Sequence, residues 1–309
     1  MTPRQSLMAL AIVLTWGVNF VVIKVGLQGG LPPLLLGALR FALVAFPAAL
    51  LVPRPQVPLR WLVAYGLTIS LGQFAFLFWA MAVGLPAGLA SVVLQSQVLF
   101  TLGLSMLLLG ERLQLHNAVG VLVAMGGLGL LGWHSLNQAH TPDGMGVLLG
   151  FGLCLLAALC WACGNLINKR MQAAPSQLMG VVVWGAMVPV LPFALLSYGL
   201  EGPQRISAAL AGLDWGGVLA VLYLAYAATI LGYTLWGTLL TQLPTSTVAP
   251  LTLLVPVVGL SSAWLLLGER LAPLQLAGAA TILLGLSIHV LGGRWKALFA
   301  PPDKLPARP

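Results

Sequence analysis

LLLGERL, a run of seven residues at Leu107–Leu113, returns letter for letter at Leu265–Leu271, 158 residues further along the chain. Each copy ends a long apolar run with a polar turn that carries a glutamate and an arginine. Charged residues make up only 6% of the 309 residues, so a charged phrase that occurs twice points to an internal repeat.

The composition is that of a membrane protein. Hydrophobic residues account for 60% of the chain, and the mean hydropathy is +1.00. A soluble domain carries about a quarter charged residues to face water, so this chain has too little polar surface for a soluble globule. The net charge of +8 does not indicate nucleic-acid binding, because the basic residues are scattered and mostly lie at the ends of apolar runs.

Ten apolar runs are long enough to cross the bilayer as helices, each of which needs about 20 residues. They cover residues 6–27, 33–52, 60–83, 87–109, 115–133, 145–169, 177–199, 215–240, 246–267 and 273–292. The first run continues through Trp16 to Lys24 without a small-residue cleavage site, so we interpret it as a span and not as a removed signal. Continuous runs of this length exclude a barrel of alternating strands.

Lysine and arginine gather on one side of the predicted bundle. With the N-terminus in the cytoplasm, the cytoplasmic side holds Arg4, Arg54, Arg60, Arg112, Lys169, Arg170, Arg294, Lys296, Lys304 and Arg308. The other side holds Lys24, Arg205 and Arg270. The positive-inside rule therefore predicts that both ends of the chain are cytoplasmic.

The two halves of the chain align beyond the repeated phrase. Leu85-Pro86 matches Leu243-Pro244, Gly120 and Gly127 match Gly278 and Gly285, and Trp16–Lys24 matches Trp161–Lys169. Because each copy holds an odd number of spans, the second copy enters the membrane from the opposite side. We predict an all-α membrane protein of two inverted five-helix repeats, at residues 1–137 and 144–295, with a linker at 138–143 and a basic cytoplasmic tail at 296–309. Secondary transporters use inverted repeats to build two gates around one central site.

Several segments have a distinctive amino-acid sequence. They are WGVNFVVIKVGL from Trp16, LRFALVAFPA from Leu39, YGLTIS from Tyr65, QFAFLF from Gln73, PAGLAS from Pro86, WACGN from Trp161 and LLVPVVGL from Leu253, with the paired GERL turns. On these segments, which are spread over nearly the whole chain, the sequence resembles the EamA family of the drug/metabolite transporter superfamily. Within it, the sequence is similar to bacterial inner-membrane exporters of O-acetylserine and cysteine.

The resemblance implies a ten-helix exporter of small polar metabolites or amino acids that works by alternating access. Its central cavity would be lined by helices 1, 3, 4, 6, 8 and 9, and it would need no cofactor. It implies a bacterial inner-membrane protein in contact with the lipid bilayer, as a monomer or a homodimer. Substrates differ among family members, so the resemblance defines a class of substrate more firmly than one compound.

Arg40 lies about two turns inside the second span, where an arginine costs about 2.5–3.5 kcal/mol on insertion scales. All six acidic residues fall in loops or in the tail, so no span offers it a carboxylate. It can snorkel or bond helix-end carbonyls as structural glue, or it can face an aqueous cavity and attract a substrate carboxylate. The second copy has no arginine at the corresponding place near Trp184-Gly185, so the inverted architecture does not require one.

Other polar and aromatic side chains within the spans are candidates for contact with substrate. With Arg40, the candidates are Trp16, Asn19, Lys24, Gln73, Gln95, Gln97, Trp161, Asn165, Lys169, Tyr233 and Trp236. Each has a structural alternative: snorkelling for the lysines, interhelical hydrogen bonds for the amides, and packing for Trp236. Because Gln95 and Gln97 are two residues apart, we expect at most one of them to reach the cavity.

Prolines and glycines predict two further features. Pro250 and Pro256 are expected to interrupt the ninth span, as a moving element or as a static kink. The matched glycine pairs, seven residues apart on one helix face, predict close packing of the fifth and tenth helices.

No metal, disulfide or catalytic site is predicted. His134, His140 and Asp143 share a loop but are too loosely arranged for a metal site, and the three cysteines lack the spacing of a disulfide or metal motif. The leading hypothesis is therefore a secondary exporter and not an enzyme. The alternatives are a drug or cation exporter, which the lack of a carboxylate within the spans disfavours, a lipid flippase on the same scaffold, and a membrane enzyme acting on lipid-linked substrates.

Overall fold

The structure, a computed structural model, describes residues 1–111 and 114–298. Ten helical segments among these residues are long and apolar enough to cross a membrane: Pro3–Gln28, Pro33–Leu51, Leu59–Ala82, Ala87–Leu109, Leu115–Gln138, Gly144–Met171, Leu178–Glu201, Trp215–Gln242, Pro250–Leu267 and Pro273–Gly292. The predicted all-α fold with ten spans is confirmed. Arg112 and Leu113 of the first repeated phrase, and residues 299–309 of the predicted basic tail, lie outside the described residues.

Several spans are built from more than one helical element. The first half of the chain holds α1 (Pro3–Gln28), α2 (Pro33–Ala45), α3 (Ala48–Leu51), α4 (Leu59–Tyr65), η1 (Gly66–Gly72), α5 (Gln73–Ala82), α6 (Ala87–Val93), η2 (Leu94–Ser96), α7 (Gln97–Leu109) and α8 (Leu115–Gln138). The second half holds α9 (Gly144–Met171), η3 (Pro175–Gln177), α10 (Leu178–Leu196), η4 (Ser197–Glu201), α11 (Pro203–Ala211), α12 (Trp215–Leu222), η5 (Tyr223–Leu231), α13 (Gly232–Gln242), α14 (Thr245–Val248), η6 (Ala249–Leu253), α15 (Leu254–Leu267) and α16 (Pro273–Leu298).

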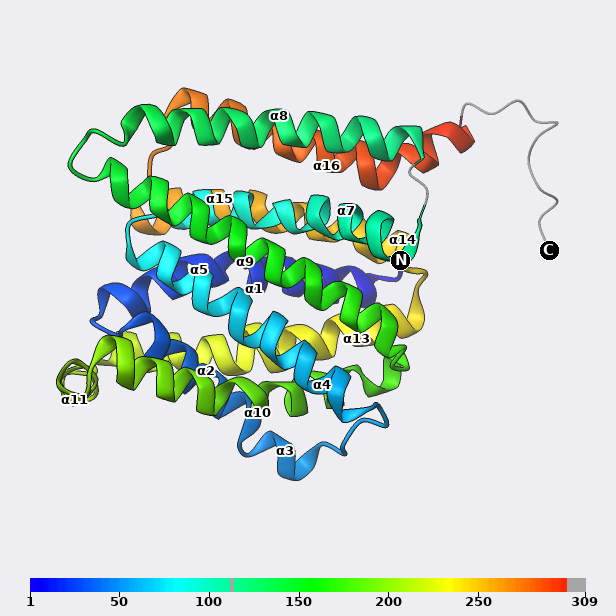
Figure 1. Ribbon diagram of the computed structural model, residues 1–309. Helices are drawn as coiled ribbons and strands as arrows, with labels where there is room; N and C mark the ends of the chain where they lie inside the picture. The colour runs from blue at the N-terminus through cyan, green and yellow to red at the C-terminus, as the bar shows by residue number, and fades with distance from the viewer. Residues whose placement is uncertain (112–113, 299–309) are drawn as a thin grey trace.

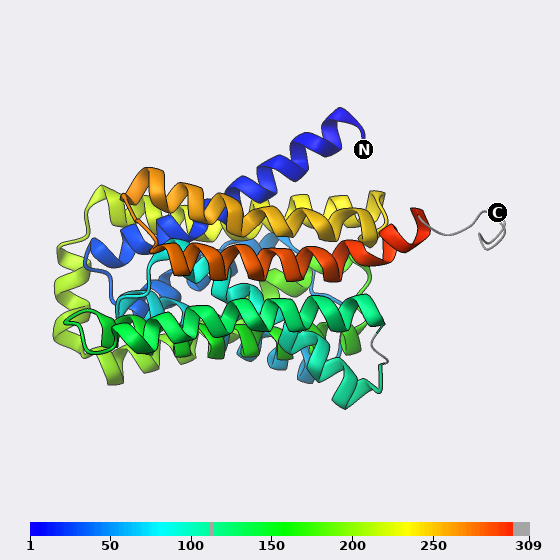
Figure 2. The ribbon, with the colours of Figure 1, turned by 90° about the horizontal axis from the view of Figure 1, so that it is seen from above.

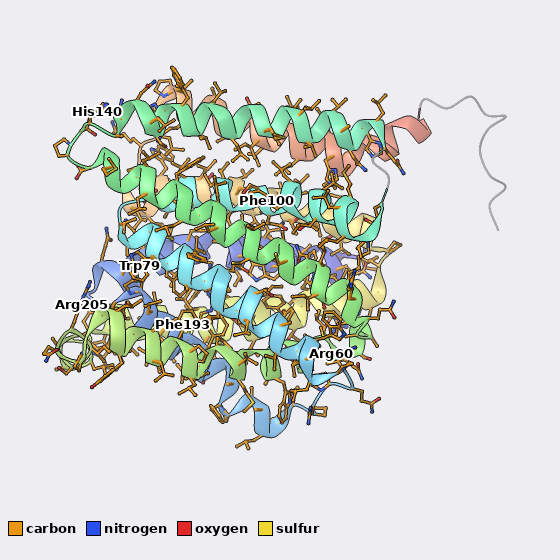
Figure 3. The ribbon with its side chains drawn as sticks, in the orientation of Figure 1. Arg60, Trp79, Phe100, His140, Phe193 and Arg205 are labelled. Carbon is orange, nitrogen blue, oxygen red and sulfur yellow. The ribbon has the colours of Figure 1, made fainter. Side chains whose placement is uncertain are left out.

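The turns between the spans collect at two ends of the bundle (Figure 1). We call the end at which α1 begins and α16 ends the near end, and the opposite end, which carries α11 and the turn between α8 and α9, the far end. Figure 3 places Arg60 at the near end and both His140 and Arg205 at the far end, while Phe100 and Phe193 lie between. Charged side chains at the two ends and aromatic ones between them fit a bundle that spans a bilayer.

The helices of the two halves pair in an exchanged pattern. The first span packs on the eighth and ninth, through α12, α13 and α15, and the sixth span, α9, packs in the same way on the third and fourth. The second span packs on the seventh, and α8 packs along α16 as an outer pair that Figures 1 and 2 both show side by side. This exchange of partners is the arrangement that two inverted copies of one five-helix unit produce.

Matching spans of the two halves also depart from α-helical winding at matching places. The third and eighth spans contain π-helical segments, η1 and η5, and the fourth and ninth contain 3₁₀ turns, η2 and η6. The offset of 158 residues that superimposes the repeated phrase brings these segments into overlap. Such windings free backbone groups and are frequent at functional sites, and in a membrane they are tolerated where they face protein or a cavity.

The predicted close packing of the fifth and tenth helices is confirmed. A Cβ atom on Gly127 would lie 2.6 Å from the backbone oxygen of Gly278, and one on Gly120 would lie 2.6 Å from that of Gly285. Only glycine allows α8 and α16 to approach so closely.

The ninth span departs from α-helical winding beside its two prolines. Pro250 lies in the 3₁₀ segment η6, and α15 begins at Leu254, two residues before Pro256. Pro256 has no N–H to donate to the backbone oxygen of Thr252, four residues earlier, and Gln95 Nε2 donates to that oxygen at 3.4 Å. The expected interruption beside the prolines is confirmed, and that this segment moves stays a prediction.

Candidate functional site

A cavity of about 130 Å³ lies between the two halves, about halfway along α1. Eight of the predicted candidates line it: Trp16, Asn19, Arg40, Gln73, Gln95, Gln97, Trp161 and Tyr233. The other lining residues are Phe20, Phe74, Leu77, Ser91, Leu94, Ala228, Thr252 and Val255. Spans 1, 3, 4, 6, 8 and 9 all contribute, and the second span joins them through Arg40.

The two glutamines of the fourth span both line the cavity, so the expectation that at most one would reach it is wrong. Gln95 lies in the 3₁₀ turn η2, and Gln97 directly follows it. With three residues per turn, side chains two positions apart are about 120° apart around the axis, closer than in an α-helix. Gln95 Nε2 also donates to the backbone oxygen of Thr252 at 3.4 Å, so the 3₁₀ turns of the two halves meet at the cavity.

Trp16 forms one aromatic wall. Its Nε1 donates to the backbone oxygen of Ala228 at 3.0 Å, an oxygen that lies in the π-helical η5. Its ring lies 5.4 Å from that of Tyr233 and 5.5 Å from that of Trp236, measured between centroids. Trp236 itself lines a smaller neighbouring pocket with Trp16, so it supports this wall from outside the cavity.

Arg40 is 2% exposed and does not snorkel, so that part of its structural alternative is wrong. Its Nη2 donates to the hydroxyl of Thr229 at 2.9 Å, and its Cζ lies 3.9 Å from the ring centroid of Phe74. The Thr229 hydroxyl in turn donates to the backbone oxygen of Leu224 at 2.8 Å, within η5. Nε and Nη1 of Arg40 are buried and have no hydrogen-bond partner.

A second pocket, of about 280 Å³, lies between the cavity and the near end. Gln97 lines both, and Thr101, Ser105 and Glu111 continue along the same side of the fourth span. Asn165 donates its amide to Gln97 Oε1 at 2.9 Å and to Thr101 Oγ1 at 3.1 Å. Lys169, one turn further along α9, forms an ion pair with Glu111, and both side chains are about half exposed, at 54% and 42%. Asn165 and Lys169 therefore belong to this near-end pocket and not to the central cavity.

At the far end a carboxylate closes the first turn of α6. Glu269 accepts hydrogen bonds from the backbone N–H groups of Ala87 at 2.8 Å and Gly88 at 2.9 Å. A carboxylate at a helix N-terminus satisfies orphan N–H donors and the helix dipole. Lys24, a predicted candidate, lies here and outside the central cavity, because two further turns of α1 separate it from Trp16. It donates to the backbone oxygen of Met81 at 3.2 Å, at the end of α5.

A second carboxylate makes the same contact with α2. Glu201, at the end of the seventh span, accepts from the backbone N–H groups of Leu34 at 2.7 Å and Leu35 at 3.1 Å, and from the hydroxyl of Ser197 at 2.6 Å. Between these caps and the cavity lie side chains with no exposed surface, namely Ile23, Phe78, Met81, Leu85 and Leu89. The far end is thus closed by two caps from the second repeat and an apolar plug.

The two glutamates of the repeated phrase therefore have different partners. Glu269 caps the fourth span at the far end, whereas its counterpart Glu111 pairs with Lys169 at the near end. By the alignment, the residues that correspond to Ala87 and Gly88 are the first two of α14. The polar near-end pocket and the capped far end give the bundle one open and one closed side.

Sequence reasoning missed several of these residues. Glu201 and Glu269 read as loop residues, because nothing local in the sequence reveals that an acid caps a helix more than 150 residues away. Thr229 and Phe74, which hold the guanidinium of Arg40, look like ordinary apolar-helix residues. The one available signal for Phe74 is its place directly after Gln73.

A ten-helix membrane protein whose exchanged halves enclose a polar cavity has the architecture of a secondary transporter. The chain belongs to the EamA-like transporter family, whose model matches residues 4–133 and 148–291. Membership places it in the drug/metabolite transporter superfamily, as the sequence predicted.

Similar proteins cover almost the whole chain. A protein of Salmonella typhimurium named a probable amino-acid metabolite efflux pump is 53% identical over 95% of this chain and 97% of its own length. One of Escherichia coli with the same name is 49% identical over 96% of this chain and 98% of its own. A solved crystal structure that is 21% identical matches with a TM-score of 0.61 over 97% of this chain and 100% of that one, which supports the fold alone.

Proposed function

We propose that this protein exports small amino-acid-like metabolites, of the cysteine and O-acetylserine type, across the bacterial inner membrane by alternating access. The observation that carries the proposal is the polar, aromatic-walled cavity between the two halves, which a polar pocket extends to the near end while the far end is closed. A site that is open to one side and built from both repeats is what alternating access requires. The names of the two efflux pumps similar to this chain support export as the direction.

The chemistry of the cavity suits a small zwitterion. The amides of Asn19, Gln73 and Gln95 supply both donors and acceptors, and the aromatic walls exclude water from the remainder of the ligand. A volume of about 130 Å³ fits a compact amino acid better than a drug-sized molecule. No aspartate or glutamate occurs among the lining residues that the structure describes, so a lipophilic cation would find no counter-charge there.

The near end is assigned to the cytoplasm, because Arg4, Arg54, Arg60, Lys169 and Arg170 gather there. In that orientation, the conformation described above admits substrate from the cytoplasm. In the alternate conformation Glu269 would release α6, and Glu111 would leave Lys169 to cap the first turn of α14. One pair of equivalent glutamates would then close the two ends in turn.

Efflux from proteoliposomes tests the proposal. Purified protein is reconstituted, vesicles are loaded with labelled cysteine, O-acetylserine or an aromatic amino acid, and efflux is followed with and without a pH gradient. We expect efflux of the first two. Val255→Trp should abolish it by filling the cavity, while Val257→Trp, on the same helix but 43% exposed toward lipid, should leave it intact.

Two results would contradict the proposal. Wild-type vesicles that release none of these amino acids faster than empty ones would remove the substrate class. Equal efflux by the Val255→Trp and Val257→Trp variants would show that the central cavity is not the route.

A further inference from the structure

Arg40 is a buried guanidinium with no counter-ion in the protein. Among the residues that the structure describes, the one ion pair between side chains is Lys169–Glu111 at the near end. Arg40 lies far from it, on the wall of the central cavity, with 2% of its surface exposed. A buried charge is costly unless it is paired, so this site is electrostatically incomplete.

The surroundings of Arg40 hold the guanidinium in place without using all its donors. Phe74 covers one face at 3.9 Å from Cζ, and Thr229 accepts from Nη2 at 2.9 Å. The N–H donors of Nε and Nη1 have no partner. A purely structural arginine would spend these donors on backbone carbonyls, because unmade buried hydrogen bonds are destabilising.

The fold itself does not need a cation at this place. The residue 145 positions further along, at the corresponding place of the second repeat, is Gly185, where a Cβ atom would lie 2.9 Å from the ring of Tyr65, so the second repeat has no side chain there. The presence of an arginine in one repeat only is therefore explained by ligand binding and not by a need of the fold.

The cavity offers a second unpartnered polar atom of opposite character. Asn19 is buried, lines the cavity, and its Oδ1 accepts no hydrogen bond. An amide oxygen can accept from an ammonium group and also from the N–H of an acylated amine. The described lining residues include no acidic side chain that would pair with an ammonium group and favour it over an acylated nitrogen.

We propose that Arg40 binds the carboxylate of the transported substrate, with Asn19 accepting from its nitrogen, so that the site requires a carboxylate but not a free amino group. The inference rests on the proposed export function and narrows its substrate class to small carboxylates that carry an N–H, including N-acylated amino acids. A charge-assisted pair in a dry site supplies the selectivity.

The test compares three probes on the wild-type protein: L-cysteine, L-cysteinamide and N-acetyl-L-cysteine, under reducing conditions. Binding is measured by the rise in thermal stability of the purified protein, and transport by inhibition of labelled cysteine efflux. Loss of the carboxylate should weaken binding by about tenfold to a hundredfold, as expected for a lost charged hydrogen bond. Acetylation of the nitrogen should change it by less than about threefold.

Variants assign the effect to Arg40. Arg40→Gln should bring the acid and the amide to nearly equal affinity, and Arg40→Lys should keep part of the preference because it keeps the charge. Arg60→Gln, at the exposed near end, is the control and should preserve the preference in full. If Arg40→Gln does not fold, the three-probe comparison on the wild type still decides whether the site requires a carboxylate and not a free amino group.

The outcomes separate this inference from the proposed function. Binding of the acid over the amide without efflux would remove export but leave the Arg40 assignment standing. Efflux in which the amide competes as well as the acid, or in which N-acetylcysteine fails to compete, would overturn the inference while export stands. Failure of the wild type to bind any of the three would overturn both.

Discussion

At the scale of single residues, Arg40 shows how a membrane interior can hold a charge without an acid. An arginine in the middle of a span costs about 2.5–3.5 kcal/mol on insertion scales. Stacking on Phe74 and a hydrogen bond to Thr229 offset part of this cost, since cation–π contacts gain strength when water is excluded. The remainder is left for a ligand to offset, which fits a site that must bind and release.

Thr229 is expected to position Arg40, and Thr229→Val tests this. Valine keeps the shape of threonine but leaves Nη2 without its acceptor, at a cost of about 1.5–3 kcal/mol for a hydrogen bond to a charged group. We expect the half-saturating substrate concentration for efflux to rise about tenfold, with little change in the maximal rate. Thr229→Ser should restore it. An unchanged preference for acid over amide in Thr229→Val, with only lower stability, would mean that Thr229 supports the fold alone.

At the scale of helical elements, irregular winding shapes the cavity. The π-helical η5 brings the carbonyl of Ala228 to Trp16 and the hydroxyl of Thr229 to Arg40, and the 3₁₀ turn η2 turns two glutamines to the same side. A regular α-helix would have used the carbonyl of Ala228 in its own backbone ladder. The cavity therefore depends on departures from ideal helices in both repeats.

The outer pair α8–α16 is held by close approach of backbones, and Gly127→Ala tests how much this matters. A Cβ atom there would lie 2.6 Å from the backbone oxygen of Gly278, so the helices must separate. Overpacking of this kind costs about 1–3 kcal/mol. We expect Gly127→Ala to lower the resistance of the protein to unfolding by sodium dodecyl sulfate.

The neighbouring Gly126 provides the matched control. Its Cβ would meet nothing within 4 Å, so Gly126→Ala should be neutral or stabilising by up to about 1 kcal/mol through helix propensity. Equal behaviour of the two variants would show that the contact between α8 and α16 does not limit stability.

At the scale of the whole molecule, the inverted repeats differ in which end is closed. The far end has two carboxylate caps, each of which joins the second repeat to a helix of the first. The near end has a half-exposed ion pair between Glu111, just after α7, and Lys169 of α9. The glutamates of the two LLLGERL copies are thus in different states in one structure: Glu269 caps a helix, and Glu111 forms an ion pair. Exchange of those states is the simplest route by which a symmetric scaffold changes the side to which its cavity opens.

Glu269→Gln is expected to favour the conformation that is open at the far end, because a neutral amide caps α6 less well than a carboxylate. A single cysteine in place of Thr101, in a background without the native cysteines, reports on the near-end pocket. An impermeant maleimide should label it in inside-out vesicles but not in intact cells. Adding Glu269→Gln should slow that labelling.

Labelling of the Thr101→Cys protein from outside intact cells would reverse the assigned orientation. Labelling at an unchanged rate after Glu269→Gln would show that this cap does not hold the far end closed.

The membrane location, the ten spans and the inverted duplication follow from the sequence alone. The length of each apolar run predicts a spanning helix, because in a bilayer each backbone polar group must be satisfied within its own helix. The repeated LLLGERL phrase shows the duplication by comparison of the two halves alone. The polar residues within the spans could be named for the same reason, since each is costly in lipid wherever it points.

Which of those residues meet was decided only by the tertiary structure. Trp16, Arg40, Gln73 and Tyr233 come from four different spans, and their side chains face one cavity because of helix rotation and the π and 3₁₀ segments. The sequence placed Lys24 and Lys169 at opposite ends of the bundle, but only the structure shows their partners, the backbone oxygen of Met81 and the carboxylate of Glu111. The caps by Glu201 and Glu269 join residues more than 150 positions apart, and no local pattern encodes a contact whose partner is a backbone N–H that every residue type except proline carries.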